Sequence, residues 1–120
     1  QEIGDKSGEG TTLNNISRIF QARSDQGKAL DFAQRSLTIS QEIGDVAGLC
    51  ATLFNMGHIH MQNGEQNEAL SAWVTVYTVA SQINLAQALQ ALEQLAGQLG
   101  QEGGLAFWAA LTQQMENTAE

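Results

Sequence analysis

The chain has 120 residues, 42% of them hydrophobic and 15% charged, which suits one soluble globular domain with a modest core and excludes two independent domains. Five lysine and arginine residues against thirteen aspartate and glutamate residues give a formal net charge of -8, so a nucleic acid is not an expected partner, because its phosphates would be repelled. No stretch approaches the roughly 18 consecutive apolar residues of a membrane-spanning helix, and we expect no membrane partner.

Charge is distributed unevenly along the chain. All five cations lie in the first 35 residues, which also hold five acidic residues, so residues 36–120 carry the whole net charge. Cys50 is the single cysteine, so no internal disulfide can form and a reducing, cytoplasmic compartment is the simplest expectation. We expect its side chain to be a small buried hydrophobe and not a reactive nucleophile.

The chain repeats itself with a period of forty residues. The pentapeptide at residues 1–5, Gln-Glu-Ile-Gly-Asp, recurs unchanged at residues 41–45, and fourteen positions of residues 1–40 are identical in residues 41–80. Residues 81–120 match the second copy at only seven positions. We therefore expect one domain over residues 1–120 with three units, 1–40, 41–80 and a divergent 81–120 that also forms the cap.

Each unit is expected to contain two helices. Residues 1–5 match the end of a second helix, so we expect them to finish a preceding pair, with at least one more repeat upstream in a longer protein. Apolar spacing in the second unit predicts a helix over about 48–63 that ends before Gly64, and another from about Ala69 to Ile83.

Two short segments mark the expected helix ends. Gly44 and Asp45 suit the end of one helix and the cap of the next. Gly103 and Gly104 precede an amphipathic segment from Leu105, which we expect to be a C-terminal capping helix.

These elements predict an all-α chain, and the absence of proline and of alternating valine-rich segments agrees with that class. One helix pair buries only the faces that its two helices turn toward each other, so the next pair must cover the remaining apolar stripe. The expected product is a right-handed α-solenoid with a groove. Small residues are expected where helices cross closely, at Gly57, Gly97, Ala29, Ala69 and Ala109.

The second unit carries a recognisable pattern. The segment Leu53-Phe54-Asn55-Met56-Gly57, together with Gly64, Ala69-Leu70, Trp73 and the Ile-Gly-Asp-x-x-Gly linkers at 3–8 and 43–48, resembles the tetratricopeptide repeat. It is most similar to the forty-residue form found in kinesin light chains, in Leu-Gly-Asn-repeat proteins and in bacterial multidomain proteins. Ser17 and Leu95 depart from the pattern, at positions where glycine and asparagine stand in other copies.

The resemblance implies a non-catalytic scaffold or adaptor that binds a peptide or a partner helix in the concave groove formed by the first helix of each pair. It assigns groove positions to three helices, and we call the following set the groove residues: Asn14, Asn15, Arg18, Phe54, Asn55, His58, Met61, Gln94 and Gln98. Thr11, Gln21, Ala51, Gln62, Ala91, Leu95 and Gln101 are further groove positions.

Among the groove residues, Asn15 and Asn55 are the main candidates for ligand contact, because an amide can both donate to and accept from the main chain of an extended ligand. The alternative, that each asparagine ties together the inter-helix turns of its own unit, stays open. Arg18 suggests an acidic residue in the ligand near the first unit, and an ordinary surface ion pair of Arg18 is the alternative.

Other chemistry is not expected. Cys50 and His58 are eight residues apart on one helix, about 12 Å along its axis, which is too far for one metal ion or for a nucleophile and its base. We expect no metal, no cofactor and no enzymatic activity. A rival function is self-assembly into a homo-oligomer through exposed repeat ends or exchanged terminal helices.

Overall fold

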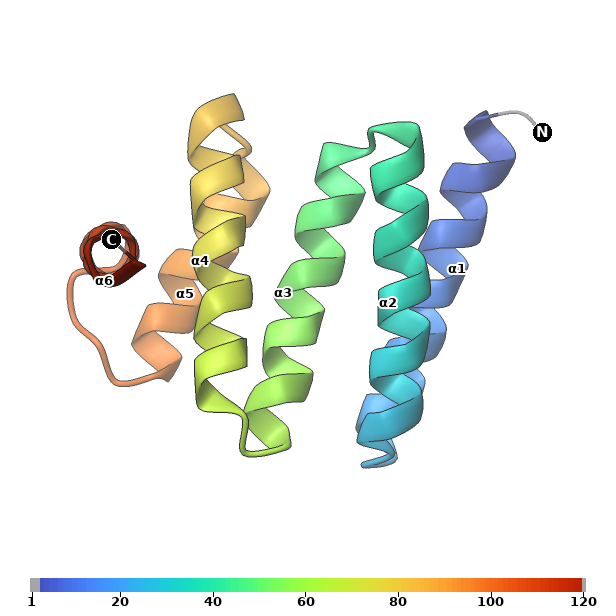
Figure 1. Ribbon diagram of the computed structural model, residues 1–120, viewed down its shortest axis with the longest axis horizontal. Helices are drawn as coiled ribbons and strands as arrows, with labels where there is room; N and C mark the ends of the chain where they lie inside the picture. Colours follow the sequence, from blue (N-terminus) through green and yellow to red (C-terminus); the bar gives the residue numbers. More distant parts are fainter. Residues whose placement is uncertain (1–2, 120) are drawn as a thin grey trace. The chain divides into compact units, whose positions relative to one another are not determined.

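The computed structural model describes residues 3–119, and these form six α-helices and no strand (Figure 1). The all-α class is confirmed. Two compact units share the chain, the first ending at Ala72 and the second beginning at Trp73, within the fourth helix. The helices are α1 (Ile3–Ala22), α2 (Gln26–Ile43), α3 (Val46–Gln62), α4 (Gln66–Ile83), α5 (Ala86–Gln98) and α6 (Leu105–Ala119).

The turn between α2 and α3 has the predicted caps. Gly44 takes the left-handed conformation, with φ of 70°, and its N–H donates to Ser40 O. Asp45 then caps α3, since its Oδ1 accepts the N–H of Gly48 at 2.9 Å. This side chain satisfies one of the backbone donors that the first turn of a helix leaves unpaired. Asp25 caps α2 in the same way, accepting from the N–H of Lys28 at 3.2 Å.

The first copy of the pentapeptide behaves differently, and the expectation that it finishes a preceding helix is wrong for its described part. Ile3, Gly4 and Asp5 belong to α1, which runs without a break to Ala22. Gln1 and Glu2 lie outside the described residues. A glycine permits a helix end without imposing one. The second copy turns because Gly44 and the residues after it bond back to α2 and cap α3.

The core of the first unit lies between three helices that run side by side, each antiparallel to the next along the chain (Figure 1). Ala29 and Ala33 on α2 and Ile59 on α3 are fully buried, with Phe20 of α1 packed against them. Two alanines in one stripe of α2 let the neighbouring helices approach closely. The predicted close crossings at Ala29, Ala69 and Gly57 are thus at buried positions.

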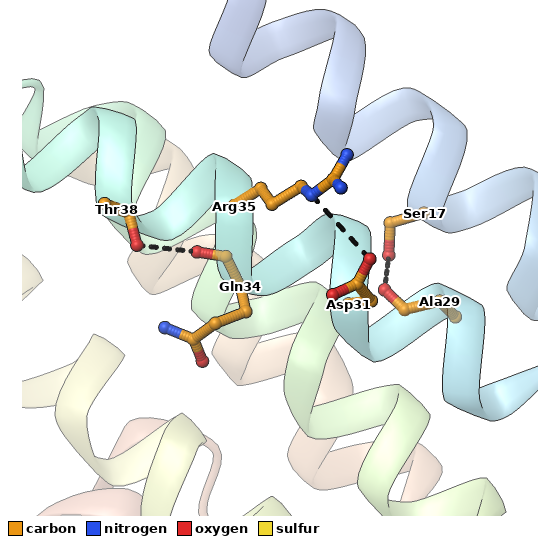
Figure 2. A network of polar contacts seen from close by, with 6 residues as sticks. All are labelled: Ser17, Ala29, Asp31, Gln34, Arg35 and Thr38. Carbon is orange, nitrogen blue, oxygen red and sulfur yellow. Dashed lines mark hydrogen bonds and ion pairs between the residues drawn. The ribbon is translucent and has the colours of Figure 1, made fainter.

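Buried hydroxyl groups also join the helices of this unit. Ser17 on α1 has no exposed surface, and its Oγ donates to Ala29 O on α2 at 2.6 Å (Figure 2). Ser36 on α2 donates to Gly10 O on α1 at 2.8 Å. The Ser36 hydroxyl has one proton, and that proton goes to Gly10 O. Thr52 on α3 is therefore the donor in the 3.1 Å contact between the Ser36 and Thr52 hydroxyls. The hydrogen bond from Ser17 to α2 therefore explains why a serine stands where the other copies have glycine.

The contacts along the exposed face of α2 are of another kind. Arg35 Nε lies 3.7 Å from Asp31 Oδ2, and Thr38 donates to Gln34 O, both within one helix (Figure 2). Such exposed contacts contribute little to stability.

The second unit is organised around two tryptophans. Trp73 on α4 and Trp108 on α6 are buried, with their rings edge to face at 6.0 Å between centroids. The indole N–H of Trp108 donates to Leu92 O on α5 at 2.7 Å. Figure 1 shows α6 end-on, so it crosses α5 steeply.

Three expectations for the third copy are wrong. Gly97 and Ala109 are exposed and not at close crossings, and Leu95 is a core residue and not a groove residue. For Ala109 the reason is length: α5 has 13 residues, against 17 in α3, so the forty-residue register does not carry over to the residues that follow α5. Leu95 lies inside α5 and keeps the register, since it is buried like Asn55 at the equivalent position of α3. Trp108 occupies the buried position that the register gives to Ala109.

Candidate functional site

The groove residues of the first unit lie on two helices that contact each other, α1 and α3. Asn14, Asn15 and Arg18 lie on α1, and the first is half-buried while the other two are exposed. On α3, Phe54, His58 and Met61 are half-buried, and the rings of Phe54 and His58 meet edge to face with centroids 5.0 Å apart. The remaining two, Gln94 and Gln98, are exposed on α5 of the second unit.

Asn15 and Asn55 differ in spite of their equivalent positions in the repeat. Asn55 is buried, and its Nδ2 donates both to Asn14 Oδ1 and to Ser17 Oγ, at 3.3 Å each. This amide joins α3 to α1, so these two partners lie on another helix and not in the turns of its own unit. Asn15 is exposed on the surface of α1.

A cavity of about 130 Å³ opens between α1, α2 and α3, and we call it the hydroxyl pocket. It includes Thr11, Asn14 and Ala51, three of the positions assigned to the groove. Hydroxyl groups from all three helices line it. Its polar side chains are Ser7, Thr11, Asn14, Ser36, Ser40, Asp45 and Thr52.

Ser40 and Asp45, two polar groups beside Gly48, keep unused hydrogen-bonding capacity. Ser40 is only 4% exposed, and its hydroxyl makes no hydrogen bond within residues 3–119. Asp45 uses Oδ1 to cap α3, which leaves Oδ2 available. A Cβ added to Gly48 would lie 3.0 Å from Ser40 Oγ and closer still to Asp45 Oδ2. Glycine at position 48 therefore lets the Asp45 carboxylate and the Ser40 hydroxyl pack closely against the start of α3.

Burial changes the acid–base behaviour of two side chains on α3. It lowers the pKa of His58 below its ordinary value of 6.5, because the charged imidazolium loses solvation. It raises the pKa of the Cys50 thiol, which is 1% exposed and therefore confirmed as a buried residue. A buried, protonated thiol is a poor nucleophile.

The turn after α3 contains a second polar cluster. His60 Nδ1 lies 2.9 Å from Glu65 Oε1, and Asn63 Nδ2 donates to the same oxygen at 3.0 Å. The hydrogen bond from Asn63, followed by the contact with His60, lowers the pKa of Glu65. The cluster fixes the turn from α3 to α4. Among the described side chains, no group of three or more His, Cys, Asp or Glu residues is placed to hold a metal ion.

The hydroxyl pocket was not predicted from the sequence. Ser36 and Ser40 are one helical turn apart on α2 and Thr52 lies on α3, so three hydroxyl residues interrupt otherwise apolar faces. That interruption was the available signal. It does not reveal that the three residues meet at one place, because no motif in the sequence relates α2 to α3 at these positions.

Comparisons of the chain with protein-family models, with curated proteins and with solved structures find no match. Over the part of the chain that the structure describes, every helix is too short or too polar to span a membrane.

Proposed function

We propose that the chain is a tetratricopeptide-like scaffold, a right-handed solenoid of three helix pairs, which binds an extended peptide across α1 and α3 of the first unit. The observation that carries this proposal is the hydroxyl pocket, since its lining includes three of the positions assigned to the groove. A concave site with a few converging polar groups is the usual form of a ligand site in a protein.

The surroundings of the pocket supply further recognition chemistry. Arg18 follows Asn14 by one turn of α1 and is exposed, so it can pair with a carboxylate of the ligand. Phe54, His58 and Met61 offer half-buried apolar surface along α3. An extended peptide would thus meet a charged group and an apolar strip on two neighbouring helices.

A peptide-display selection against the immobilised chain tests this proposal. Selected peptides are then measured by fluorescence anisotropy with the wild type, Arg18→Ala and Arg23→Ala. Both arginines are exposed on α1 or in the turn after it, and only Arg18 belongs to the groove residues. We expect Arg18→Ala to weaken binding about tenfold, the loss of one charge-assisted contact, and Arg23→Ala to have little effect. No enriched peptide, or equal losses in both variants, would refute the proposal.

Self-assembly is a second candidate, and one exposed residue favours it. Ile19 on α1 is 51% exposed, whereas Ile59, its equivalent in the repeat, is fully buried. A second copy that covers Ile19 would bury this apolar surface. Sedimentation tests the candidate: a mass that rises with concentration for the wild type and stays monomeric for Ile19→Ser supports it, and a monomer throughout refutes it.

A further inference from the structure

The hydroxyl pocket has more capacity to accept hydrogen bonds than its own groups use. The Ser36 proton goes to Gly10 O and the Thr52 proton goes to Ser36. Thr52 Oγ1 can therefore only accept any further hydrogen bond. Asp45 Oδ2 is an acceptor with a negative charge, and Asp45 makes no ion pair within residues 3–119. The Ser40 hydroxyl can accept as well as donate. A ligand with several donors and a positive charge would complement this arrangement.

The lining has only one sign of charge. Asp45 is its single charged residue, so nothing in the lining neutralises the carboxylate. The chain as a whole carries a formal charge of -8, which attracts cations and repels anions over longer distances. An anionic ligand group is therefore disfavoured at this place, whereas the exposed Arg18 can still receive one further along α1.

The size and the walls of the pocket narrow the choice of cation. A volume of about 130 Å³ is that of about four water molecules, enough for a short alkyl chain with a charged end. Ile39, Ile43 and Ala51 contribute apolar surface to the walls. An amine on a methylene stem buries the stem against such walls and keeps its charge among polar groups. An ammonium group also has three donors, which suit Asp45 Oδ2, Ser40 Oγ and Thr52 Oγ1.

We infer that the hydroxyl pocket binds the ammonium group of a lysine side chain in the bound segment, held between Asp45 and Ser40. This inference rests on the proposed function, and it adds the ligand residue that the pocket selects. Gly48 is part of the site, because a side chain there would displace the Asp45 carboxylate.

A titration with a small amine tests the pocket without the peptide. We would add n-butylammonium chloride to the ¹⁵N-labelled chain and follow its amide resonances, with sodium chloride and 1-pentanol as controls for ionic strength and for the uncharged shape. We expect saturable shifts confined to amides near Asp45, Gly48 and Thr11 with the amine alone. Shifts that do not saturate, equal shifts with 1-pentanol, or shifts centred elsewhere would overturn the inference.

Two matched carboxylate variants sharpen the test. Asp45→Asn removes the charge while asparagine remains as good a helix cap as aspartate, so α3 is retained. Asp25→Asn makes the same change at the cap of α2, outside the pocket. We expect Asp45→Asn to weaken n-butylammonium binding about tenfold and Asp25→Asn to leave it unchanged. Equal effects of the two variants would overturn the role of Asp45.

Ser40→Ala is an independent test, because it removes the second proposed contact and leaves the helix cap at Asp45 unchanged. We expect this variant to bind n-butylammonium more weakly as well. An unchanged affinity in Ser40→Ala would overturn the proposed contact. Glycinamide, which carries an α-amino group, distinguishes a peptide N-terminus from a lysine, and tighter binding of glycinamide would overturn the lysine assignment. If peptides bind but n-butylammonium does not, this inference is refuted and the proposed function stands. Amine binding without peptide binding refutes the proposed function and the lysine assignment, and it leaves only the ammonium site.

Discussion

Ser17→Ala tests whether the buried hydroxyl groups stabilise the first unit. The Ser17 hydroxyl has no exposed surface, donates to Ala29 O at 2.6 Å and accepts from Asn55 Nδ2 at 3.3 Å. Each hydrogen bond contributes about 0.5–1.5 kcal/mol net, so the loss of both should destabilise the chain by about 1–3 kcal/mol. Alanine keeps the Cβ and favours the helix, so the substitution leaves almost no cavity.

Urea denaturation followed by circular dichroism measures this loss. With a slope of about 1–3 kcal/mol per molar urea, a destabilisation of about 2 kcal/mol lowers the midpoint by about 1 M. Thr38→Ala is the matched control, because it removes an exposed hydroxyl that also donates to a backbone carbonyl, that of Gln34. Its free energy of unfolding should change by less than about 0.5 kcal/mol.

A double-mutant cycle with Asn55→Ala isolates the bond between Ser17 and Asn55. We expect a coupling of about 0.5–1.5 kcal/mol, because the two single variants remove the same contact. If Ser17→Ala is no more destabilising than Thr38→Ala, or if the coupling is absent, the buried hydroxyl network makes no net contribution and the reasoning is refuted.

Three further predictions concern other parts of the chain. Trp108→Phe should destabilise the chain by about 1–3 kcal/mol in urea, since it removes the bond to Leu92 O, and an unchanged midpoint would contradict this. Gly44→Ala should lower the thermal midpoint, because φ is 70° there, whereas Gly97→Ala, inside α5 with open space around it, should raise it; shifts of the same sign would contradict the prediction. Because burial lowers the pKa of His58, the folded chain binds this proton less readily than the unfolded chain. Stability should therefore fall as the pH decreases below 6.5, and His58→Gln should flatten that slope in urea midpoints measured across this range.

The sequence alone reveals the forty-residue repeat, and its local patterns predict the all-α class and several helix ends. Gly44 and Asp45 act as predicted because helix caps depend on the backbone freedom of one residue and the side chain of the next. Helical spacing likewise located α3 and α4 to within a few residues. These features involve contacts between residues close together in the chain, which sequence patterns describe well.

Tertiary packing decided what the same patterns left open. Identical pentapeptides form the end of α2 and the turn after it at residues 41–45 and, in the described part of the first copy, the start of a helix. Asn15 and Asn55 share one repeat position, yet only Asn55 is buried against another helix. Burial depends on which neighbour covers a face, and a single repeat does not specify its neighbour.

The hydroxyl pocket is the clearest product of the tertiary structure. Asp45 and Ser40 are near in sequence, but Thr11 and Thr52 reach the same cavity from two other helices. Their convergence depends on how α1, α2 and α3 pack, and that packing is set by the shapes of Ala29, Ala33 and Ile59 in the core. Helical periodicity determines which face of each helix is apolar, whereas the three-dimensional packing determines which polar groups meet.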